Sequence, residues 1–134
     1  MKIKGSGESA SRRGPAEWFT GTVWIDAIVE AEAPSRVRLA RVSFEPGART
    51  AWHTHPVGQV LHVLSGCGLV QEEGGPVREI HPGDTVEIPA DKRHWHGAGG
   101  ANTMVHLALQ EANAEGVQVS WMEHVTEEQY NRRG

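Results

Sequence analysis

The stretch GARTAWHTHPVGQ, residues 47–59, holds the most informative pattern in the chain. It sets His53 and His55 two residues apart and places Gln59 four residues further on. Successive side chains of a β-strand point to opposite faces, so the two imidazoles project the same way and form a ready-made chelate. A proline and a glycine then bend the chain, which allows the amide oxygen of Gln59 to return to the same side.

The stretch KRHWHGA, residues 92–98, repeats this arrangement with His94 and His96 on one face. A single histidine is more often a surface residue or a hydrogen-bonded core residue than a ligand. Two His-x-His pairs flanked by glycine and proline turns instead favour a metal site, provided that the two stretches lie side by side. Imidazole suits zinc, copper, iron and nickel and, together with oxygen ligands, manganese.

Length and charge restrict the class of protein. A chain of 134 residues has the length of one domain and buries about 70% of its unfolded surface. Its 13 basic and 17 acidic residues are dispersed and give a formal charge of −4, so no basic stripe suggests nucleic acid or a membrane surface. We expect a small-molecule partner. Cys67 is the sole cysteine and no apolar run resembles a signal peptide or a membrane span, which favours a cytoplasmic protein.

Short apolar or alternating segments separated by glycine and proline turns predict an all-β fold. We expect strands within GTVWIDAIVEA, RVRLARVSF, GQVLHVLSG, CGLVQEE, DTVEIP, NTMVHLALQE and VQVSWMEHV. Thr126 and Gln129 stand at capping-box spacing, so a short helical turn is predicted near the C-terminus. Residues 1–16 read as an N-terminal arm, either flexible or packed on a neighbouring subunit, and residues 17–134 read as one domain.

Two spaced motifs resemble those of the cupin superfamily. Gly47-x5-His53-x-His55-x3-Gln59-x6-Gly66 resembles the first cupin motif, and Gly83-x5-Pro89-x-Asp91-x2-His94 resembles the second. The resemblance implies a single jelly-roll β-barrel with a metal held inside by His53, His55, Gln59 and His94. Gln59 stands where cupins usually have glutamate, and Asp91 where they usually have glycine.

The glutamine can be interpreted physically. Three neutral imidazoles and an amide leave a divalent ion with its full charge, which makes a stronger Lewis acid but weakens the retention of a hard cation. The alternative is that Gln59 lies too far away and that the site has three histidines, or stays empty.

A narrower resemblance spans nearly the whole chain, in GPAEWFTGTV, FEPGARTAWHTHPVGQ, SGCG, EIHPGD, KRHWHGA, HLALQE and WMEHVTEEQY. These segments are similar to the bacterial cupin hydroxynitrile lyases, which are manganese-dependent and cleave or form aromatic cyanohydrins such as mandelonitrile. Gln59 belongs to that pattern. The resemblance implies Mn²⁺, with Fe²⁺, Zn²⁺ and Ni²⁺ as alternatives, and a homo-oligomer, either a dimer or a tetramer.

The strand alternation also predicts a cavity lining. In MVHLALQ, one face combines His106, Ala108 and Gln110 with a methionine, and the other is uniformly aliphatic. We expect the mixed face to line a cavity, or else to meet solvent, and the aliphatic face to pack against another layer. Small side chains in RVRLARVSF and the Thr50 hydroxyl, which precedes the first histidine pair, extend the predicted substrate pocket. This pocket comprises Ala40, Val42, Phe44, Thr50 and Ala108.

The predicted chemistry is cyanohydrin cleavage, mandelonitrile giving benzaldehyde and HCN with R selectivity. The metal acts as Lewis acid, His96 transfers the proton, and His106 and Gln110 hydrogen-bond the cyanide or carbonyl group. Two other functions fit the sequence. One is an iron-dependent cupin dioxygenase, although the carboxylate common at non-haem iron is missing from the ligand set. The other is a small-molecule-binding cupin without catalysis.

Overall fold

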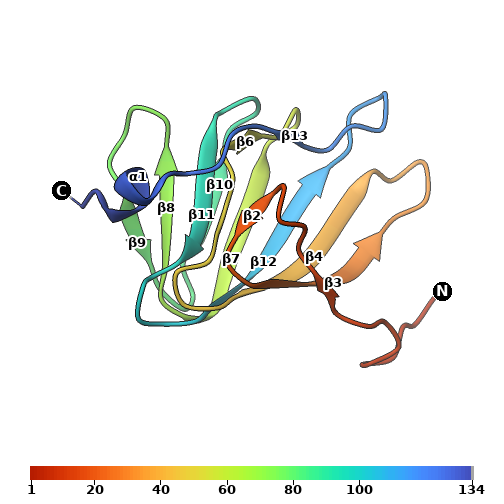
Figure 1. Cartoon of the computed structure of the whole chain (residues 1–134). Coiled ribbons are helices and arrows are strands. Elements are labelled where there is room, and N and C mark those ends of the chain that lie inside the picture. The colour runs from red at the N-terminus through yellow and green to blue at the C-terminus, as the bar shows by residue number, and fades with distance from the viewer. Residues whose placement is uncertain (134) are drawn as a thin grey trace.

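The chain forms two β-sheets that face each other, as the computed structural model of residues 1–133 shows (Figure 1). The first sheet has six strands in the order β1-β3-β4-β12-β7-β10, and its neighbouring pairs are antiparallel. These strands are β1 (Arg12–Arg13), β3 (Val23–Glu30), β4 (Val37–Phe44), β12 (Met104–Glu111), β7 (Gln59–Gly66) and β10 (Thr85–Ile88).

The second sheet is built mainly from short strands. Its path is β13-β6-β11-β5-β2, with β8 added beside β11 and β9 beside β8. The strands are β13 (Ser120–Trp121), β6 (His53–Thr54), β11 (His94–Ala98), β5 (Arg49–Thr50), β2 (Phe19–Thr20), β8 (Gly68–Glu72) and β9 (Arg78–Ile80). The predicted all-β barrel with one short C-terminal helix is confirmed.

The core lies between the sheets, and alternate residues along much of β7 and β12 and at the end of β4 are buried in it. Across β3, β4 and β12, Val23, Phe44 and Met104 stand in one register row, and each is at most 1% exposed. In a neighbouring row Val42 pairs with His106, which is fully buried. The same inward face therefore carries apolar packing at one end and imidazole further along.

The opposite face of β12 is less covered than the sequence suggests. Leu109 is 39% exposed, and Val105 and Leu107 are only partly buried. These side chains point out of the barrel, and their exposure shows that the rest of this chain covers them only in part; the expectation that they pack against another layer remains a prediction. Inward packing in this fold comes from the second sheet alone.

The predicted strand within VQVSWMEHV is also shorter than expected. Only Ser120 and Trp121 form a strand, β13, which pairs with β6. Beyond it the chain still runs beside Trp52, whose backbone N–H donates to the Glu123 carbonyl at 2.9 Å and whose carbonyl accepts from the Met122 N–H at 2.9 Å.

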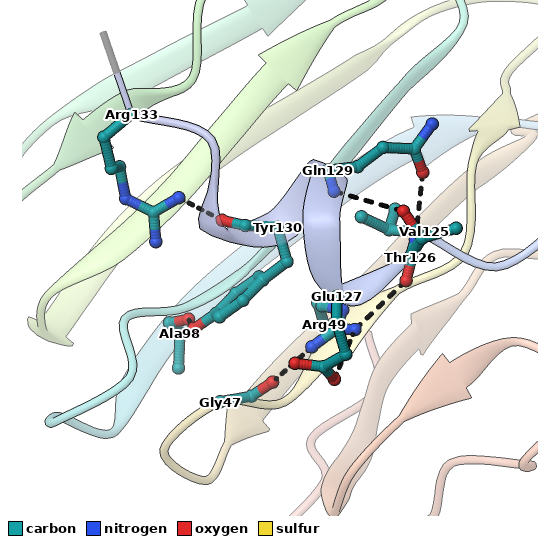
Figure 2. Close-up of polar contacts among 9 residues, drawn as sticks. All are labelled: Gly47, Arg49, Ala98, Val125, Thr126, Glu127, Gln129, Tyr130 and Arg133. Carbon is teal, nitrogen blue, oxygen red and sulfur yellow. Dashed lines mark hydrogen bonds and ion pairs between the residues drawn. The ribbon is translucent and has the colours of Figure 1, made fainter.

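Helix α1 (Glu127–Asn131) covers the outer face of the second sheet (Figures 1 and 2). It begins with the predicted capping box, in which the Thr126 hydroxyl accepts from the Gln129 N–H and the Gln129 amide oxygen accepts from the Thr126 N–H. The Tyr130 hydroxyl donates to the Ala98 carbonyl at 2.7 Å. Trp95 and Tyr130 belong to an apolar cluster beneath the helix, separate from the core between the sheets.

A buried arginine fastens the same corner (Figure 2). Arg49 is 3% exposed, and its guanidinium donates to the Val125 carbonyl at 3.1 Å and to the Glu127 carboxylate at 3.0 Å. The cation also lies 4.4 Å from the centre of the Tyr130 ring. These contacts tie β5, which lies within the first motif, to the C-terminal helix.

Two motif positions have backbone explanations. Gly66 has φ 80°, and a Cβ there would lie 1.8 Å from the Thr103 carbonyl oxygen, so only glycine fits. Asp91, which replaces the usual glycine of the second motif, has φ 59°, a left-handed conformation that aspartate tolerates better than most residues.

The N-terminal arm reaches the barrel of its own chain through β1, whose Arg12 and Arg13 pair with Ile25 and Trp24 of β3. The boundary that we predict at residue 16 remains a prediction. Among the residues that the structure describes, no helix is both long and apolar enough to cross a bilayer.

Candidate metal centre and cavity

The two His-x-His stretches meet inside the barrel. His53 of β6 pairs directly with His94 of β11, and their ring centres lie 4.2 Å apart. His55 follows β6, with its ring 5.0 Å from that of His53, and Gln59 opens β7. All four predicted ligands are at most 6% exposed. The spatial convergence that the motifs predict is therefore present.

Main-chain carbonyls fix which nitrogen each of three rings turns toward the centre. The Nδ1 atoms of His53, His55 and His94 lie 2.8, 2.7 and 2.8 Å from the carbonyl oxygens of Ala51, Gln118 and Lys92. A carbonyl can only accept, so each Nδ1 must donate. The lone pair of every neutral ring then stands on Nε2, the arrangement found in metal-bound histidines.

A chain of three amides sets the orientation of Gln59. Its Nε2 donates to Gln110 Oε1 at 2.9 Å, and Gln110 Nε2 donates to Gln118 Oε1 at 3.0 Å. Because the nitrogen of Gln59 is used in this way, its oxygen faces His94 Nε2, 3.4 Å away. Gln118 thus anchors His55 through its main chain and Gln59 through its side chain.

This geometry fits a cation. With the proton of His94 on Nδ1, its Nε2 and the Gln59 oxygen present two lone pairs to each other without a hydrogen between them. His55 Nε2 is also buried without a hydrogen-bond partner. Buried acceptors that lack a donor are destabilising, and a cation at their meeting point would satisfy them. Three imidazoles and one amide oxygen are a suitable donor set for a divalent transition metal.

Burial keeps these rings neutral. It lowers the pKa of His53 well below 6.5 and that of His55 below 6.5, and it lowers the pKa of His94 to about 4. The neighbouring imidazoles lower the pKa of His53 further. A neutral imidazole is the form that binds metal, so protons do not compete for the site near pH 7.

His96 and His106 form a second histidine pair beside the first. His96 Nδ1 and His106 Nε2 are 3.0 Å apart, and the outer nitrogens, His96 Nε2 and His106 Nδ1, are buried without hydrogen-bond partners. Burial lowers the pKa of His96 well below 6.5 and that of His106 to about 4, so both are neutral at pH 7. Two neutral imidazoles carry two N–H protons in total. One of them lies in the hydrogen bond between the rings, and the other occupies one of the two outer nitrogens.

His96 is also close enough to compete as a ligand. Nitrogen atoms of His53, His94 and His96 all lie within 4.8 Å of one another. His53 and His94 belong both to this group of three and to the predicted metal ligands, so the choice lies between His55 and His96. His55 has its Nδ1 fixed by a main-chain carbonyl as they do, whereas His96 shares a movable proton with His106. This difference favours His55 as the ligand and His96 as a proton carrier.

The site opens into a cavity of about 410 Å³. The predicted residues on its wall are Ala40, Val42, Thr50, His53, His55, Gln59, His96, His106, Ala108 and Gln110. Phe44 is predicted to line the substrate pocket, but it does not border the cavity; its ring packs against that of His106, with the ring centres 5.3 Å apart. His94 is fully buried and also does not border the cavity.

Aromatic rings line another part of the wall. Trp18 and Trp121 stack with their centres 5.3 Å apart and their planes within 8°, and Trp121 lies 4.6 Å from the ring of His53. Phe19 completes this wall, 5.7 Å from Trp121. Such a surface suits a flat apolar group held next to the histidine cluster.

The sequence does not indicate the role of Gln118, and it offers Trp18 and Trp121 only among five tryptophans that could form a ligand surface or a subunit interface. Gln118 acts partly through its main-chain carbonyl, which no side-chain pattern reveals. Trp18 and Trp121 lie more than a hundred positions apart, and only the pairing of β13 with β6 brings Trp121 onto His53. Gln118 and Trp121 stand three positions apart and give no periodic signal of their own.

Comparison with known proteins agrees with this architecture. The cupin domain family matches residues 40–109, more than half of the chain. This chain belongs to the cupin family. The cupin is 58% identical over 132 residues to an (R)-mandelonitrile lyase from Granulicella tundricola, covering 98% of this chain and 100% of that relative.

Solved structures show the same fold. A cupin-like protein from Thermotoga maritima superposes on this cupin with a TM-score of 0.85 at 38% identity, covering 94% of this chain and 95% of the other. The polyketide cyclase RemF from Streptomyces resistomycificus superposes with a TM-score of 0.69 at 20% identity, covering 97% and 90% of the two chains. The second likeness concerns the fold alone.

Proposed function

We propose that this cupin is a hydroxynitrile lyase that cleaves and forms aromatic cyanohydrins, converting mandelonitrile to benzaldehyde and HCN with R selectivity. The observation that carries the proposal is the 58% identity to an (R)-mandelonitrile lyase across that relative's full length. The cavity supports it independently, because a neutral ligand cluster, a histidine pair and an aromatic wall border one space.

We assign metal binding to His53, His55, Gln59 and His94, with Mn²⁺ as the ion and Fe²⁺, Zn²⁺ or Ni²⁺ as alternatives. Bound there, the ion would supply Lewis acidity toward an oxygen or nitrogen ligand. The donors carry no charge, so none of the ion's charge is neutralised by the protein in its immediate surroundings. The fixed Nε2 lone pairs and the amide chain through Gln110 hold these donors in place.

The histidine pair supplies the proton transfer. As a cyanohydrin loses its hydroxyl proton, His96 takes it on Nε2, the nitrogen that has no partner in the protein, and His106 stabilises the resulting imidazolium through the 3.0 Å hydrogen bond. The proton returns to cyanide as it leaves. The low pKa of both rings makes the imidazolium a strong acid, which favours that return.

Gln110 has a different position from the one expected for a group that binds cyanide. Its amide already accepts from Gln59 and donates to Gln118, so we propose that it mainly positions Gln59. The aryl ring of the substrate would lie against Trp18 and Trp121, with Val42 and Ala40 leaving room beside it.

The test is release of benzaldehyde from mandelonitrile by purified protein, with Mn²⁺, after chelation, and after Mn²⁺ is restored. We expect cleavage above the buffer rate that chelation abolishes and Mn²⁺ restores. His62→Ala is the active control, because the partly buried His62 does not border the cavity and its ring lies 2.9 Å from the Thr85 hydroxyl. Equal rates with and without protein would refute the lyase. Oxygen consumption by the iron-loaded protein would instead favour the dioxygenase.

We further propose that the chain acts in the cytoplasm as a homo-oligomer, either a dimer or a tetramer. The half-exposed aliphatic face of β12, with Leu109 39% exposed, supports an oligomer in which a second copy covers that face. Light scattering during size exclusion tests it, and a purely monomeric protein at micromolar concentration would refute it.

A further inference from the structure

A second group of metal-binding side chains lies on the outside of the barrel, away from the cavity. Ligand atoms of Cys67, Glu79 and His81 all lie within 4.8 Å of one another. We propose that these three residues form a surface site for a thiophilic divalent cation, of which Zn²⁺ is the natural example. The proposal does not depend on the lyase activity.

Strand pairing explains why the three side chains meet. Gly68 of β8 pairs with Ile80 of β9, and Leu69 pairs with Glu79. Ile80 is 5% exposed and packs into the core between the sheets, so its neighbours Glu79 and His81 must point outward. Continuing the register by one residue places Cys67 opposite His81. The backbone thus presents all three ligands on one outer face.

The turn after β9 also orients the imidazole. His81 Nε2 lies 3.3 Å from the Glu79 carboxylate, and its Nδ1 lies 3.7 Å from Asp84 Oδ2. Asp84 is itself held in place, because its Oδ2 accepts from the His81 backbone N–H at 2.7 Å. A carboxylate beside the non-ligating nitrogen is the usual support of a metal-bound histidine. Asp84 therefore favours Nε2 as the nitrogen that faces the ion.

The chemistry of this set differs from that of the cavity. A thiolate, an imidazole and a carboxylate match the zinc ligands found in proteins, with water as the fourth ligand. Cys67 as thiolate and Glu79 together neutralise the charge of a divalent ion, whereas the cavity ligands neutralise none of it. Binding displaces the thiol proton into solvent. Thiolate favours zinc over manganese, so the two sites would hold different metals.

Binding of a zinc ion would require only small movements of the Cys67, Glu79 and His81 side chains. Ligand atoms around a tetrahedral zinc lie about 3.5 Å apart, given bonds of roughly 2.0 to 2.3 Å. The side chains of His81 and Glu79 are 56% and 66% exposed, so they can close on the ion without disturbing the core. The site is also remote from the cavity ligands. Gly68 pairs with Ala98, at the end of β11 opposite to His94, and four residues of strand span about 13 Å.

The test is a titration of the full chain with Co²⁺ after its cavity is loaded with Mn²⁺. A bond between cobalt and a thiolate gives a charge-transfer band in the near ultraviolet, and Cys67 is the sole thiol of the chain. We expect the band to saturate at one Co²⁺ per chain and to be abolished by Zn²⁺. Cys67→Ser should remove it and leave cyanohydrin cleavage unchanged.

His81→Ala and Glu79→Gln decide whether a three-residue site exists. Each should weaken Co²⁺ binding by about tenfold or more, while the control His62→Ala leaves it unchanged. No band at a tenfold excess of Co²⁺, or equal affinity in His81→Ala and wild type, would overturn the proposal. A second measurement uses no spectrum: Zn²⁺ should slow the labelling of Cys67 by a thiol reagent in wild type but not in His81→Ala, and an absence of protection in wild type would also overturn it.

Discussion

Replacing Gln118 by alanine isolates the amide chain from the rest of the metal centre. The substitution removes the oxygen that accepts from Gln110 Nε2 at 3.0 Å. It keeps the main-chain carbonyl that accepts from His55 Nδ1 at 2.7 Å. The ring of His55 therefore stays fixed, while the amide of Gln110, and through it that of Gln59, becomes free to rotate.

The size of the effect follows from one hydrogen bond between neutral groups. Such a bond contributes about 0.5 to 1.5 kcal/mol, and about 1.4 kcal/mol corresponds to a factor of ten in affinity, so Gln118→Ala should weaken Mn²⁺ binding by about 2- to 12-fold. Gln110→Leu removes both amide contacts of the chain, at 2.9 and 3.0 Å, and should weaken binding by about 5- to 150-fold.

Calorimetric titration of the metal-free proteins with Mn²⁺ measures these differences directly. Gln71→Ala is the matched control, because Gln71 is a partly buried glutamine whose amide bonds Trp95 and Gly75 on the outer side of the second sheet. It should lose stability without losing metal affinity. The reasoning fails if folded Gln118→Ala binds Mn²⁺ as tightly as wild type, or if Gln71→Ala is weakened equally.

Three further results are expected. His106→Ala and His96→Ala should each lower kcat/KM for mandelonitrile by about 10²- to 10⁴-fold, and all variants should retain Mn²⁺ affinity. The double variant should be no worse than either single variant, because the two rings share one proton. Additive losses would contradict that shared proton. Burial lowers the pKa of His94 and His106 to about 4, so between pH 6.5 and pH 4 these two rings take up protons in the unfolded chain but not in the metal-free fold. The contribution of the two rings to the free energy of unfolding should be complete above pH 6.5 and fall by up to about 2.7 kcal/mol per pH unit toward pH 4. Urea unfolding at several pH values measures this loss. Arg49→Met should destabilise the fold by about 1 to 3 kcal/mol, because it leaves the buried Val125 carbonyl without its donor. Glu127→Gln should cost less than about 1 kcal/mol, because the Glu127 side chain is 78% exposed. Equal losses in thermal unfolding would show that the ion pair dominates instead.

The sequence predicts the centre of this molecule better than its periphery. Strand alternation places His53 and His55 on one face of their own segment, as it does His94 with His96. That the two segments meet is implied only by their resemblance to the paired cupin motifs, and the structure supplies the pairing of His53 with His94. Phe44 shows the limit of the same rule. Alternation places it on the inward face, but whether an inward side chain borders a cavity or fills the core depends on depth along the barrel, which the sequence does not carry.

Other features depend on pairings between distant segments. Trp121 reaches His53 only because β13 pairs with β6, and Gln118 reaches His55 through a backbone carbonyl. The short length of β13 has a similar cause. Its segment has the alternation of a strand, but the continuing backbone bonds run to Trp52, outside a regular ladder.

The neutrality of the cavity ligands links the metal centre to the histidine pair. A divalent ion buried among uncharged donors keeps its charge in surroundings of low polarity, where an uncompensated charge is costly. An ion held there would therefore favour an anionic partner in the cavity, and a cyanohydrin can supply one by losing its hydroxyl proton. His96 and His106 can accept the proton that this ionisation releases, although burial makes them weak bases, because the ion's uncompensated charge favours the ionised substrate. A carboxylate in place of Gln59 would bind the ion more tightly and weaken that advantage. In the function that we propose, the Gln59 amide is therefore the group that would connect metal retention to proton transfer.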